Sequence, residues 1–462
     1  MLRKLGMKRK YFGTDGIRGK FGEEPMTSGF LYRTGKAAAE HFALDQPPLF
    51  IIGRDTRESG PILESAFCQG VESAGGHCHR IGVVPTAAVA VNTVTQNAAA
   101  GAMISASHNP YSDNGIKLFN PQGFKLSDDV ELSIEQRIDA CDLPELEPEN
   151  NLSFFTDADA TKSYHETIRS SLPEKFSLDG SHIVVDASHG AAYQTTPDFL
   201  ESLGATVTRL NTDPDGTNIN ANCGSQHTES ICATVQKLSP PESASSCRPL
   251  GLAHDGDADR LIMIDENGVP LDGDELLAIL GVGMLKAGNL TSHTVAATVM
   301  SNLGLDACIA QHGGKVIRTD VGDRYILEAM QQHGLSLGGE QSGHMIFLDH
   351  LPTGDGLMSS IQALRFIQES GQPLSELRKI LKKFPQKLYN LKVREKRSLE
   401  EMPEVHALIQ QAEVNLGDTG RIFFRYSGTE NLARLLVEAK DANAIEPLAQ
   451  SILTPLQESI GL

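Results

Sequence analysis

The chain has 462 residues, too many for a single hydrophobic core, and its length indicates roughly three or four domains. Hydrophobic residues make up 40% and charged residues 21%, which is typical of a globular protein. The formal net charge of −19 argues against nucleic acid or an anionic membrane as a partner, because either would need a broad basic face.

Short apolar strands alternate with turns and longer amphipathic segments along most of the chain. The first clear example is a strand at 49–52, followed by a helix from about Ser59. The same order recurs at 182–190, 294–304, 315–330 and 335–344. Continuous apolar strands that alternate with helices predict an α/β fold with mostly parallel sheets. In such sheets the ligand-binding groups lie on loops beyond the carboxyl ends of the strands, where this chain has its polar clusters.

Four domains are predicted, at 1–155, 156–265, 266–380 and 381–462. The first three share an order of elements without sharing sequence, which suggests an internal triplication. The last has a helix near 400–412, two strands and a final helix, the pattern of a small α+β domain. The stretch between about 375 and 400 is interpreted as the segment that lets this domain close.

The stretch "HDGDADR" at 254–260 places Asp255, Asp257 and Asp259 at alternate positions between two apolar strands. In an extended backbone these carboxylates project from one side. Three carboxylates at close range repel one another unless a cation lies among them, and hard oxygen ligands favour Mg²⁺. The simpler alternative is an acidic turn in an acidic chain. We expect a metal site here, with Arg260 either neutralising the acids or contacting a phosphoryl group.

Ser107 lies in "ISASHNP" at 104–110, a stretch of turn-forming residues that alone predicts only a loop. A Ser107–His108 dyad is not expected, because neighbouring side chains in an extended chain point apart. Whether Ser107 is a nucleophile therefore depends on the other motifs.

Two loops offer donors for a phosphate. "FGTDGIRG" at 12–19 combines glycine amides with Arg18, although glycine-rich turns are common. The second loop, "RYSGTENLAR", combines guanidinium groups, a hydroxyl and backbone amides: Arg425, Ser427, Gly428, Thr429 and Arg434.

The loop "GGEQSGH" at 338–344 offers Glu340, Ser342 and His344 after a strand. A carboxylate, a hydroxyl and an imidazole at alternate positions suit the recognition of sugar hydroxyls. The alternative is a polar turn without function.

Competing motifs fail on context. There is no Walker A sequence and no G-x-G-x-x-G. "GLSLG" at 334–338 matches G-x-S-x-G, but Ser336 lies within a predicted strand rather than at a strand-to-helix turn. "HCHR" at 77–80 has two histidines, too few for a metal site. A haloacid-dehalogenase interpretation would make Asp255 the nucleophile and would leave Ser107 unexplained.

In this order the five motifs "FGTDGIRG", "ISASHNP", "DGDADR", "GEQSGH" and "RYSGTE" resemble those of the α-D-phosphohexomutase family. The similarity spans essentially the whole chain. It is closest to the branch that acts on glucosamine phosphates, through "GEQSGH", the "SGTE" tail loop and "NINANCGSQH" at 218–227.

The resemblance implies three similar α/β domains with mixed sheets and a small C-terminal α+β domain around a central cleft. It implies that Ser107 carries a phosphoryl group and that Asp255, Asp257 and Asp259, with Ser107, hold one Mg²⁺ ion. The residues implied in catalysis beside Ser107 are Arg18, His108, Lys117 and Arg260. Lys117 would either transfer a proton or give electrostatic support.

The implied ligands of the substrate are Glu340, Ser342 and His344 for the sugar and Arg425, Ser427, Gly428, Thr429 and Arg434 for its phosphate.

The implied reaction interconverts glucosamine 6-phosphate and glucosamine 1-phosphate through glucosamine 1,6-bisphosphate, which also serves as activator. Ser107 would first be phosphorylated by a kinase or by self-phosphorylation. The alternatives are a phosphomannomutase or phosphoglucomutase with the same mechanism, or a member that binds phosphosugars without catalysis.

A cytoplasmic location is expected. The seven cysteines are scattered and include no CxxC pair, which is typical of a reducing compartment. The N-terminus lacks the apolar core of a signal peptide, and the longest apolar run, at 276–285, is shorter than the ~20 residues that a membrane span needs.

Overall fold

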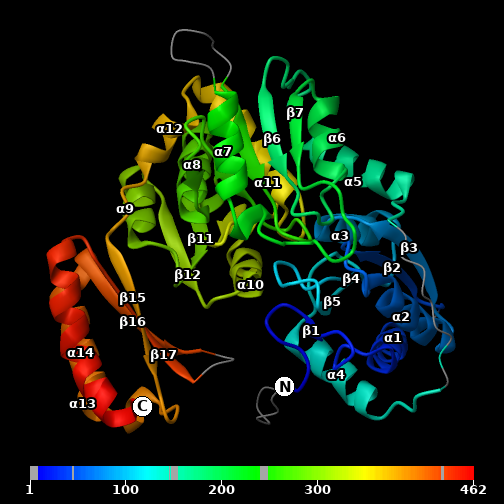
Figure 1. Cartoon of the computed structure of the whole chain (residues 1–462), viewed down its shortest axis with the longest axis horizontal. Coiled ribbons are helices and arrows are strands. Elements are labelled where there is room, and N and C mark those ends of the chain that lie inside the picture. Colours follow the sequence, from blue (N-terminus) through cyan, green and yellow to red (C-terminus); the bar gives the residue numbers. More distant parts are fainter. Residues whose placement is uncertain (1–8, 44–45, 145, 147–153, 240–247, 428–430) are drawn as a thin grey trace. The chain divides into compact units, whose positions relative to one another are not determined.

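The computed structural model describes residues 9–43, 46–144, 146, 154–239, 248–427 and 431–462. The chain divides into two compact units. The larger unit comprises Met1–Met300 and His312–Ile380, and the C-terminal unit comprises Ser301–Gln311 and Leu381–Leu462. Figure 1 follows the chain through both units from blue to red.

The first sheet of the larger unit has the strand order β1-β5-β4-β2-β3. Its strands are β1 (Ile17–Lys20), β2 (Leu49–Arg54), β3 (His77–Val83), β4 (Ala100–Ile104) and β5 (Asp113–Phe119). β2 pairs in parallel with β3 and β4, whereas β5 runs antiparallel to β4 and β1. The accompanying helices are α1 (Ser28–Phe42), α2 (Gly60–Ser73), α3 (Thr86–Thr95) and α4 (Asp128–Asp139).

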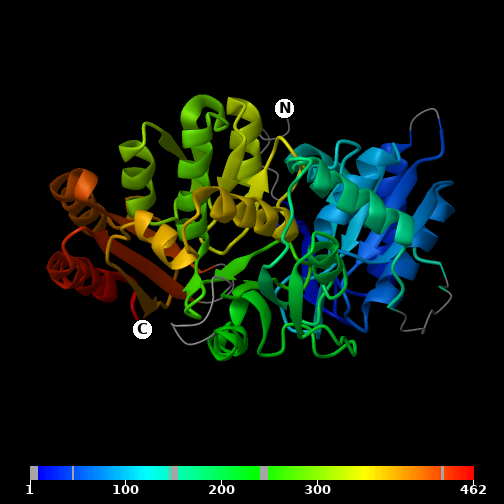
Figure 2. The ribbon, with the colours of Figure 1, turned by 90° about the horizontal axis from the view of Figure 1, so that it is seen from above.

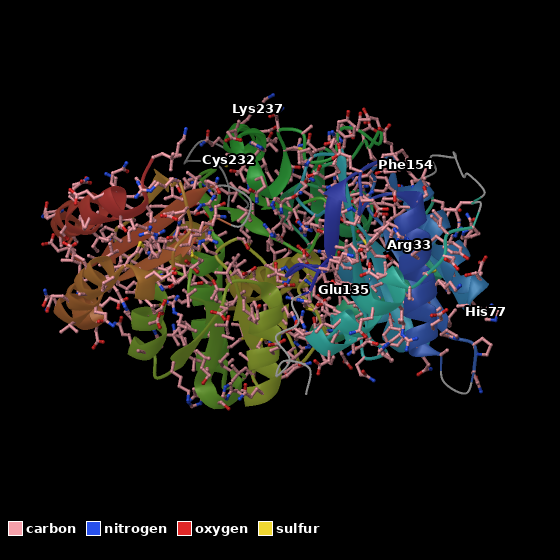
Figure 3. All side chains as sticks on the ribbon, turned by 90° about the horizontal axis from the view of Figure 1, so that it is seen from below. Arg33, His77, Glu135, Phe154, Cys232 and Lys237 are labelled. Carbon is pink, nitrogen blue, oxygen red and sulfur yellow. The ribbon has the colours of Figure 1, made fainter. Side chains whose placement is uncertain are left out.

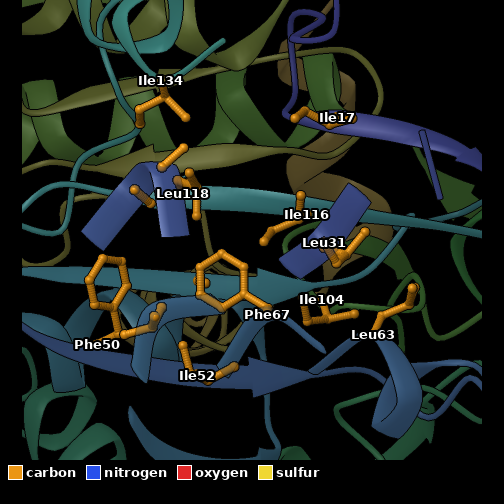
Figure 4. Packing of buried hydrophobic residues seen from close by; sticks show 14 of the residues in the cluster. Ile17, Leu31, Phe50, Ile52, Leu63, Phe67, Ile104, Ile116, Leu118 and Ile134 are labelled. Atoms are coloured by element: carbon orange, nitrogen blue, oxygen red, sulfur yellow. The ribbon is translucent and has the colours of Figure 1, made fainter. Parts of the chain in front are cut away.

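Helices cover both faces of this sheet. Successive side chains of a strand point to opposite sides, so the buried strands present apolar side chains to both layers of helices. Phe50, Ile52 and Ile104 pack with Phe67 of α2 and with residues of α1 and α4 in one buried cluster (Figure 4). On the other face Gly101 lets α3 approach closely, since a Cβ atom there would lie 2.3 Å from Thr93 Oγ1. The packed layer holds the strand ends from which the loops after β2 and β4 emerge.

The second sheet has the order β10-β9-β8-β6-β7. Its strands are β6 (His182–Asp186), β7 (Thr206–Leu210), β8 (Leu250–Ala253), β9 (Ile262–Ile264) and β10 (Pro270–Leu271). The helices are α5 (Ala158–Ser170), α6 (Thr195–Ser202) and α7 (Glu229–Leu238). Ile231 and Val235 of α7 pack against Val184, Ala253 and Ile264 of the sheet, which gives this region its core.

The third sheet has the order β12-β11-β13-β14. Its strands are β11 (Thr294–Thr298), β12 (Lys315–Thr319), β13 (Leu337–Gly339) and β14 (Met345–Phe347). The helices are α8 (Gly273–Ala287), α10 (Asp323–His333), α11 (Gly356–Ser370) and α12 (Leu374–Leu377). The carboxylate of Asp355 caps α11 and accepts the hydroxyl of Tyr164 at 2.9 Å, so it joins this region to α5.

The three sheets share one arrangement of four strands: β3-β2-β4-β5, β7-β6-β8-β9 and β12-β11-β13-β14. In each, three parallel strands are followed by a fourth that is antiparallel. The loop between the third and fourth strands contains Ser107 in the first sheet, the three aspartates in the second and Glu340 in the third. The repeated order of elements in the sequence is therefore a repeat of topology.

The C-terminal unit has an antiparallel sheet of order β15-β17-β16. Its strands are β15 (Gln386–Lys392), β16 (Gly420–Tyr426) and β17 (Leu432–Ala439), and its helices are α9 (Leu303–Gln311), α13 (Pro403–Leu416) and α14 (Ile445–Ile460). Figure 2 shows α13 and α14 together on one side of the sheet, where α13 contacts β16 and α14 contacts β17.

The strand β15 corrects the sequence prediction, which treated residues 375–400 as a connector. β15 forms an edge of the sheet and is mostly exposed, so its sequence lacks the run of apolar residues that marks a buried strand. The prediction of fold class is confirmed: three mixed α/β sheets and a small α+β unit.

No helix in the described parts of the chain is both long enough and apolar enough to span a membrane; the apolar run at 276–285 is part of the buried helix α8. None of the six cysteines described forms a disulfide.

Candidate active site

Ser107 stands at the end of β4 with its side chain buried. Its backbone has a φ of +52°, in the left-handed region that serine seldom adopts. The Ser107 N–H group donates to Ser105 Oγ at 2.8 Å, and the Ser107 hydroxyl donates to Asp255 Oδ2 at 2.6 Å. The structure thus places the predicted nucleophile directly against the predicted metal loop.

Asp255, Asp257 and Asp259 converge because the chain turns after β8. The prediction that they meet is correct, but the reason given was wrong: residues 256–258 form a turn, with Ala258 at φ +60°, rather than an extended strand. All three side chains are buried, and one carboxylate oxygen of each lies within 4.8 Å of the others. No other group of three such side chains occurs among the described residues.

The triplet fits a divalent cation. Burial, followed by the charges of Asp259 and Asp257, raises the pKa of Asp255 to about 7. Asp257 Oδ1 is buried and accepts no hydrogen bond from any described residue. Buried carboxylate oxygens that lack donors and repel one another are the ligands that a hard ion such as Mg²⁺ selects.

Lys117 lies beside the triplet on β5. Its Nζ is 2.8 Å from Asp257 Oδ2, 2.9 Å from Asp259 Oδ2 and 3.3 Å from Asp15 Oδ2. Burial alone would lower the pKa of Lys117, but these three carboxylates raise it well above its usual value. The side chain is therefore a permanent cation, which favours electrostatic support over proton transfer.

Beyond Lys117 the ion pairs continue to His344. Lys125 bridges Asp15 and Asp323, Asp323 Oδ2 lies 3.3 Å from His344 Nε2, and His344 Nδ1 lies 3.5 Å from Asp259 Oδ1. The six groups form a closed circuit of alternating charge, the charge ring: Lys117, Asp15, Lys125, Asp323, His344 and Asp259. The ring draws on loops of all three sheets and fixes their side chains relative to one another.

Histidine 344 belongs to this ring as a cation. Burial opposes its protonation, but the charges of Asp259 and Asp323 raise its pKa to about 9. The assignment of His344 to sugar recognition stays a prediction; in the structure the carboxylates of Asp259 and Asp323 lie beside its ring. The His344 side chain is buried, and its ion-pair partners among the described residues are these two aspartates.

The other two predicted sugar ligands lie in the same turn. Glu340 Oε1 accepts the N–H of Gly322 at 3.1 Å, and burial raises the pKa of Glu340. Ser342 Oγ is buried without a hydrogen-bond partner among the described residues. Glu340 is thus partly engaged, and both side chains keep acceptor or donor capacity for a ligand.

Arg18 reaches the site through the edge of the first sheet. Glu135 of α4, labelled in Figure 3, accepts the N–H groups of Lys10 at 2.8 Å and Phe12 at 2.8 Å, which fixes the segment ahead of β1. The register then sets Arg18 opposite Gly115, two residues before Lys117. Arg18 forms an ion pair with Asp15.

Arg260 and His108 complete the cluster. Arg260 Nε lies 3.9 Å from both Asp255 Oδ2 and Asp259 Oδ1; burial would lower the pKa of Arg260, yet these carboxylates raise it. His108 Nδ1 lies 3.5 Å from Ser107 Oγ, so the expectation that the two side chains point apart was wrong, because Ser107 is not extended. Burial and the charges of Arg260 and Arg18 lower the pKa of His108 to about 4, which leaves it neutral.

The predicted phosphate loop lies in the C-terminal unit. Arg425 on β16 and Arg434 on β17 are direct cross-strand partners. Burial and the charge of Arg434 lower the pKa of Arg425. Ser427 is buried at the end of β16, where its N–H donates to Leu432 O at 2.9 Å. Gly428 and Thr429 lie outside the described residues.

Comparisons with known proteins show the family to which the chain belongs. Family models match four consecutive parts of the chain: phosphoglucomutase/phosphomannomutase alpha/beta/alpha domain I at 9–145, domain II at 162–268, domain III at 272–384 and the C-terminal domain at 388–454. A phosphoglucosamine mutase from Syntrophotalea carbinolica is 44% identical over 461 residues, which cover 99% of each chain. This chain belongs to the phosphoglucomutase/phosphomannomutase family.

Solved structures of family members share the fold. A phosphoglucomutase/phosphomannomutase family protein from Burkholderia thailandensis has a TM-score of 0.77 at 21% identity, and the match covers 97% of this chain and 99% of that one. The N-acetylphosphoglucosamine mutase of Aspergillus fumigatus, solved in complex with GlcNAc-6P and magnesium, has a TM-score of 0.64 at 18% identity over 98% of this chain and 96% of that one.

Sequence reasoning missed several residues of this family site. Lys125 and Asp323 close the charge ring but stand in no recognised motif, since "GFKL" and "VGDR" resemble ordinary loop sequences. The structure also argues against the G-x-S-x-G match at 334–338. Ser336 directly precedes β13, and its Oγ accepts the N–H of Thr291 at 3.1 Å, so it is not at a strand-to-helix turn.

Proposed function

We propose that this protein is a phosphoglucosamine mutase that interconverts glucosamine 6-phosphate and glucosamine 1-phosphate. The mechanism rests on one observation: the Ser107 hydroxyl lies 2.6 Å from Asp255, within a buried triplet of carboxylates. The choice of substrate rests on the full-length similarity to proteins named phosphoglucosamine mutase.

Phosphorylated Ser107 starts the reaction by giving its phosphoryl group to the free sugar hydroxyl. The P–Oγ bond breaks, a bond from phosphorus to the sugar oxygen forms, and the hydroxyl proton ends on Ser107 Oγ. Glucosamine 1,6-bisphosphate results. The bisphosphate then reorients within the site. Its other phosphoryl group is transferred to Ser107 Oγ, and the proton of Oγ moves to the sugar oxygen.

The protein's contribution is to position the groups and to balance their charge. Arg18, Arg260 and Lys117 remain cationic and stabilise the negative charge of the transferring group. Neutral His108 lies 3.5 Å from Ser107 Oγ and would exchange the proton of that oxygen after a closer approach. The raised pKa of Lys117 assigns it to charge stabilisation.

Asp255, Asp257 and Asp259 would hold one Mg²⁺ ion together with an oxygen of phosphorylated Ser107. When bound, Mg²⁺ supplies positive charge that lowers the energy of the transferring phosphoryl group. The complex of the A. fumigatus enzyme with GlcNAc-6P and magnesium supports this assignment for the family fold.

The remaining groups would bind the substrate. Glu340 and Ser342 would accept and donate hydrogen bonds to sugar hydroxyls. Arg425, Ser427 and Arg434, with the amides of Gly428 and Thr429, would bind the phosphate that does not react. We place the reaction in the cytoplasm, where thiols stay reduced, and we assign the first phosphate on Ser107 to a kinase or to self-phosphorylation.

The mechanism is tested by mass. Purified protein should lose the mass of one phosphate on treatment with phosphatase, and peptide mass spectrometry should map that phosphate to Ser107. A phosphate on another residue, or a phosphoaspartate trapped at Asp255, would reject the mechanism.

The substrate is tested by rates with three hexose 6-phosphates. An amine at C2, largely protonated at neutral pH, can form a charge-assisted hydrogen bond worth roughly 1.5–3 kcal/mol, or about 10- to 150-fold. We expect kcat/KM for glucosamine 6-phosphate to exceed that for glucose 6-phosphate and mannose 6-phosphate by at least about tenfold. Equal turnover of a neutral sugar would make the protein a phosphogluco- or phosphomannomutase with the same mechanism.

A further inference from the structure

The segment "NINANCGSQH" at 218–227 carries part of the family resemblance but has no role in the mechanism above. Its residue Asn220 lies in the loop that follows β7 of the second sheet, and its side chain contacts the Ser107 loop of the first sheet. Asn220 Nδ2 donates to Ser107 O at 2.9 Å and to Asn109 O at 3.0 Å. The segment therefore contacts the proposed phosphoryl carrier through its backbone.

Arg57 holds the same two carbonyl groups. Its Nη2 donates to Ser107 O at 2.9 Å and to Asn109 O at 2.8 Å, while Nη1 donates to Pro110 O and, at 3.1 Å, to Asp113 O. The side chain is wholly buried. One guanidinium thus gathers four carbonyls of a single loop, which a planar fork of five donors can do and an ammonium cannot.

The charge of Arg57 is balanced within the same network. Arg57 Nε donates to Asp55 Oδ2 at 2.9 Å, Ser105 Oγ donates to that oxygen at 2.7 Å, and the N–H of Ser107 donates to Ser105 Oγ at 2.8 Å. Both the N–H and the C=O of Ser107 are therefore held by one connected set of buried groups. This set keeps Ser107 in its left-handed conformation.

Asn220 is itself held in place. Its φ is +59°, a conformation that asparagine tolerates better than most residues, and its N–H donates to Ser188 O at 2.9 Å. It packs against the turn of the aspartates: a Cβ atom on Gly256 would lie 2.5 Å from Ser107 O and 2.9 Å from Asn220 Nδ2. The carbonyl of Ser107, the amide of Asn220 and the aspartate turn are thus in direct contact.

We infer that Asn220 and Arg57 are positioning residues for Ser107: they clamp the carbonyl groups of Ser107 and Asn109 from two sides and so keep the Ser107 hydroxyl against Asp255. This inference rests on the proposed function, in which Ser107 carries the phosphoryl group. It assigns the segment 218–227 to the phosphoryl carrier rather than to the sugar.

The test compares two asparagines of this segment in the full-length protein. Asn222, like Asn220, has a positive φ, of +55°, but its side chain is exposed, so Asn222→Gly is the matched control for Asn220→Gly. Hydrogen exchange of the peptide covering 105–113 is measured together with kcat and KM.

Asn220→Gly should speed exchange in 105–113 by about tenfold or more and lower kcat by a similar factor, with KM within twofold, because a small misplacement of a reacting group is felt mainly in the chemical step. Asn222→Gly should match the wild type in all three quantities. Asn220→Asp, which turns the donor toward the carbonyls into an acceptor, should lower kcat further.

Arg57→Lys gives a second, independent variant. It keeps the charge but loses the fork, so it should reproduce the fall in kcat and the faster exchange while the protein stays folded.

Three results would overturn the inference: unchanged exchange in Asn220→Gly, faster exchange with unchanged kcat, or a raised KM with unchanged kcat. A wild-type protein without mutase activity would defeat the proposed function instead, and the exchange data would still show whether the clamp exists.

Discussion

The two regions proposed to bind phosphate differ in how their charges are arranged. Around Ser107 the cations face carboxylates, and six side chains close into the charge ring. In the C-terminal unit, Arg425 and Arg434 face each other across two strands, and like charges at such positions repel. The first region is suited to a reaction in which charge moves while the total stays balanced, whereas an anion between the two arginines would reduce the repulsion between their charges.

The contrast predicts different kinetic effects. Changes near Ser107 should lower kcat, because those groups act on the transferring phosphoryl group. Changes at the arginine pair should raise KM, because a phosphate that does not react is held equally in the ground and transition states.

The largest effect is expected for Ser107→Ala. Without the hydroxyl no phosphoryl group can be carried, so kcat should fall by about 10³-fold or more. Ser112→Ala, in the same loop, is the control and should stay active. The measurement is steady-state turnover with circular dichroism to verify folding, and appreciable turnover by folded Ser107→Ala would contradict the prediction.

Next in size is Asp257→Asn, which keeps the shape of the site and removes one charge. Mg²⁺ affinity and kcat should fall together, by about 100-fold or more, because Asp257 would be a direct ligand and the loss of a mere partner of a ligand already costs about 10- to 100-fold. Calorimetric titration with Mg²⁺ measures the affinity, and exposed Asp159→Asn is the control. Full activity of the wild type in excess chelator would refute a metal requirement.

Arg425→Ala changes the arginine pair of the C-terminal unit. The loss of one charge-assisted contact to the phosphate should raise KM by about 10- to 150-fold and leave kcat nearly unchanged. Arg397→Ala removes an arginine that already pairs with Glu395 at 2.7 Å and should leave KM as it is. A fall in kcat alone would place Arg425 in the chemical step and erase the contrast.

The smallest effect on catalysis is expected for Lys125→Met, which opens the charge ring without touching Ser107 or the triplet. Asp15 would keep Lys117 and Arg18, and Asp323 would keep His344, so we expect a loss of about 2 kcal/mol of stability and a fall in kcat of about tenfold. A double-mutant cycle with Asp323→Asn tests the ring itself: the two changes should couple by about 1 kcal/mol or more. Additive effects would mean that the ring does not act as a unit.

Local patterns in the sequence carried much of this site. The aspartates of "HDGDADR" and the loop "ISASHNP" were recognisable because their residue types are unusual at that spacing, although the turn at 256–258 was not predicted. Most helices and strands followed from apolar periodicity, and β15 escaped because an edge strand with exposed side chains has little of it.

The charge ring and the clamp on Ser107 could not have been found in this way. Lys125 meets Asp323 across 198 positions of the chain, and Asn220 meets Ser107 across 113. Such pairs depend on the packing of separate sheets, and nothing in the residues around Lys125, Asp323 or Asn220 indicates which distant residue each one meets. The left-handed conformation of Ser107 was missed for a related reason, since tertiary hydrogen bonds impose it against the preference of the residue.

In each of the three sheets the loop with the proposed function lies at the same position, between a parallel strand and its antiparallel neighbour. Hydrogen-bonded strands lie about 4.8 Å apart, so the two ends of each loop are set by the sheet and not by the loop's own sequence. A change of residues within one of these loops therefore leaves the strand pairing at its two ends intact. Each loop can be altered without repacking the core of its sheet, so the three proposed roles can be changed one at a time by mutation.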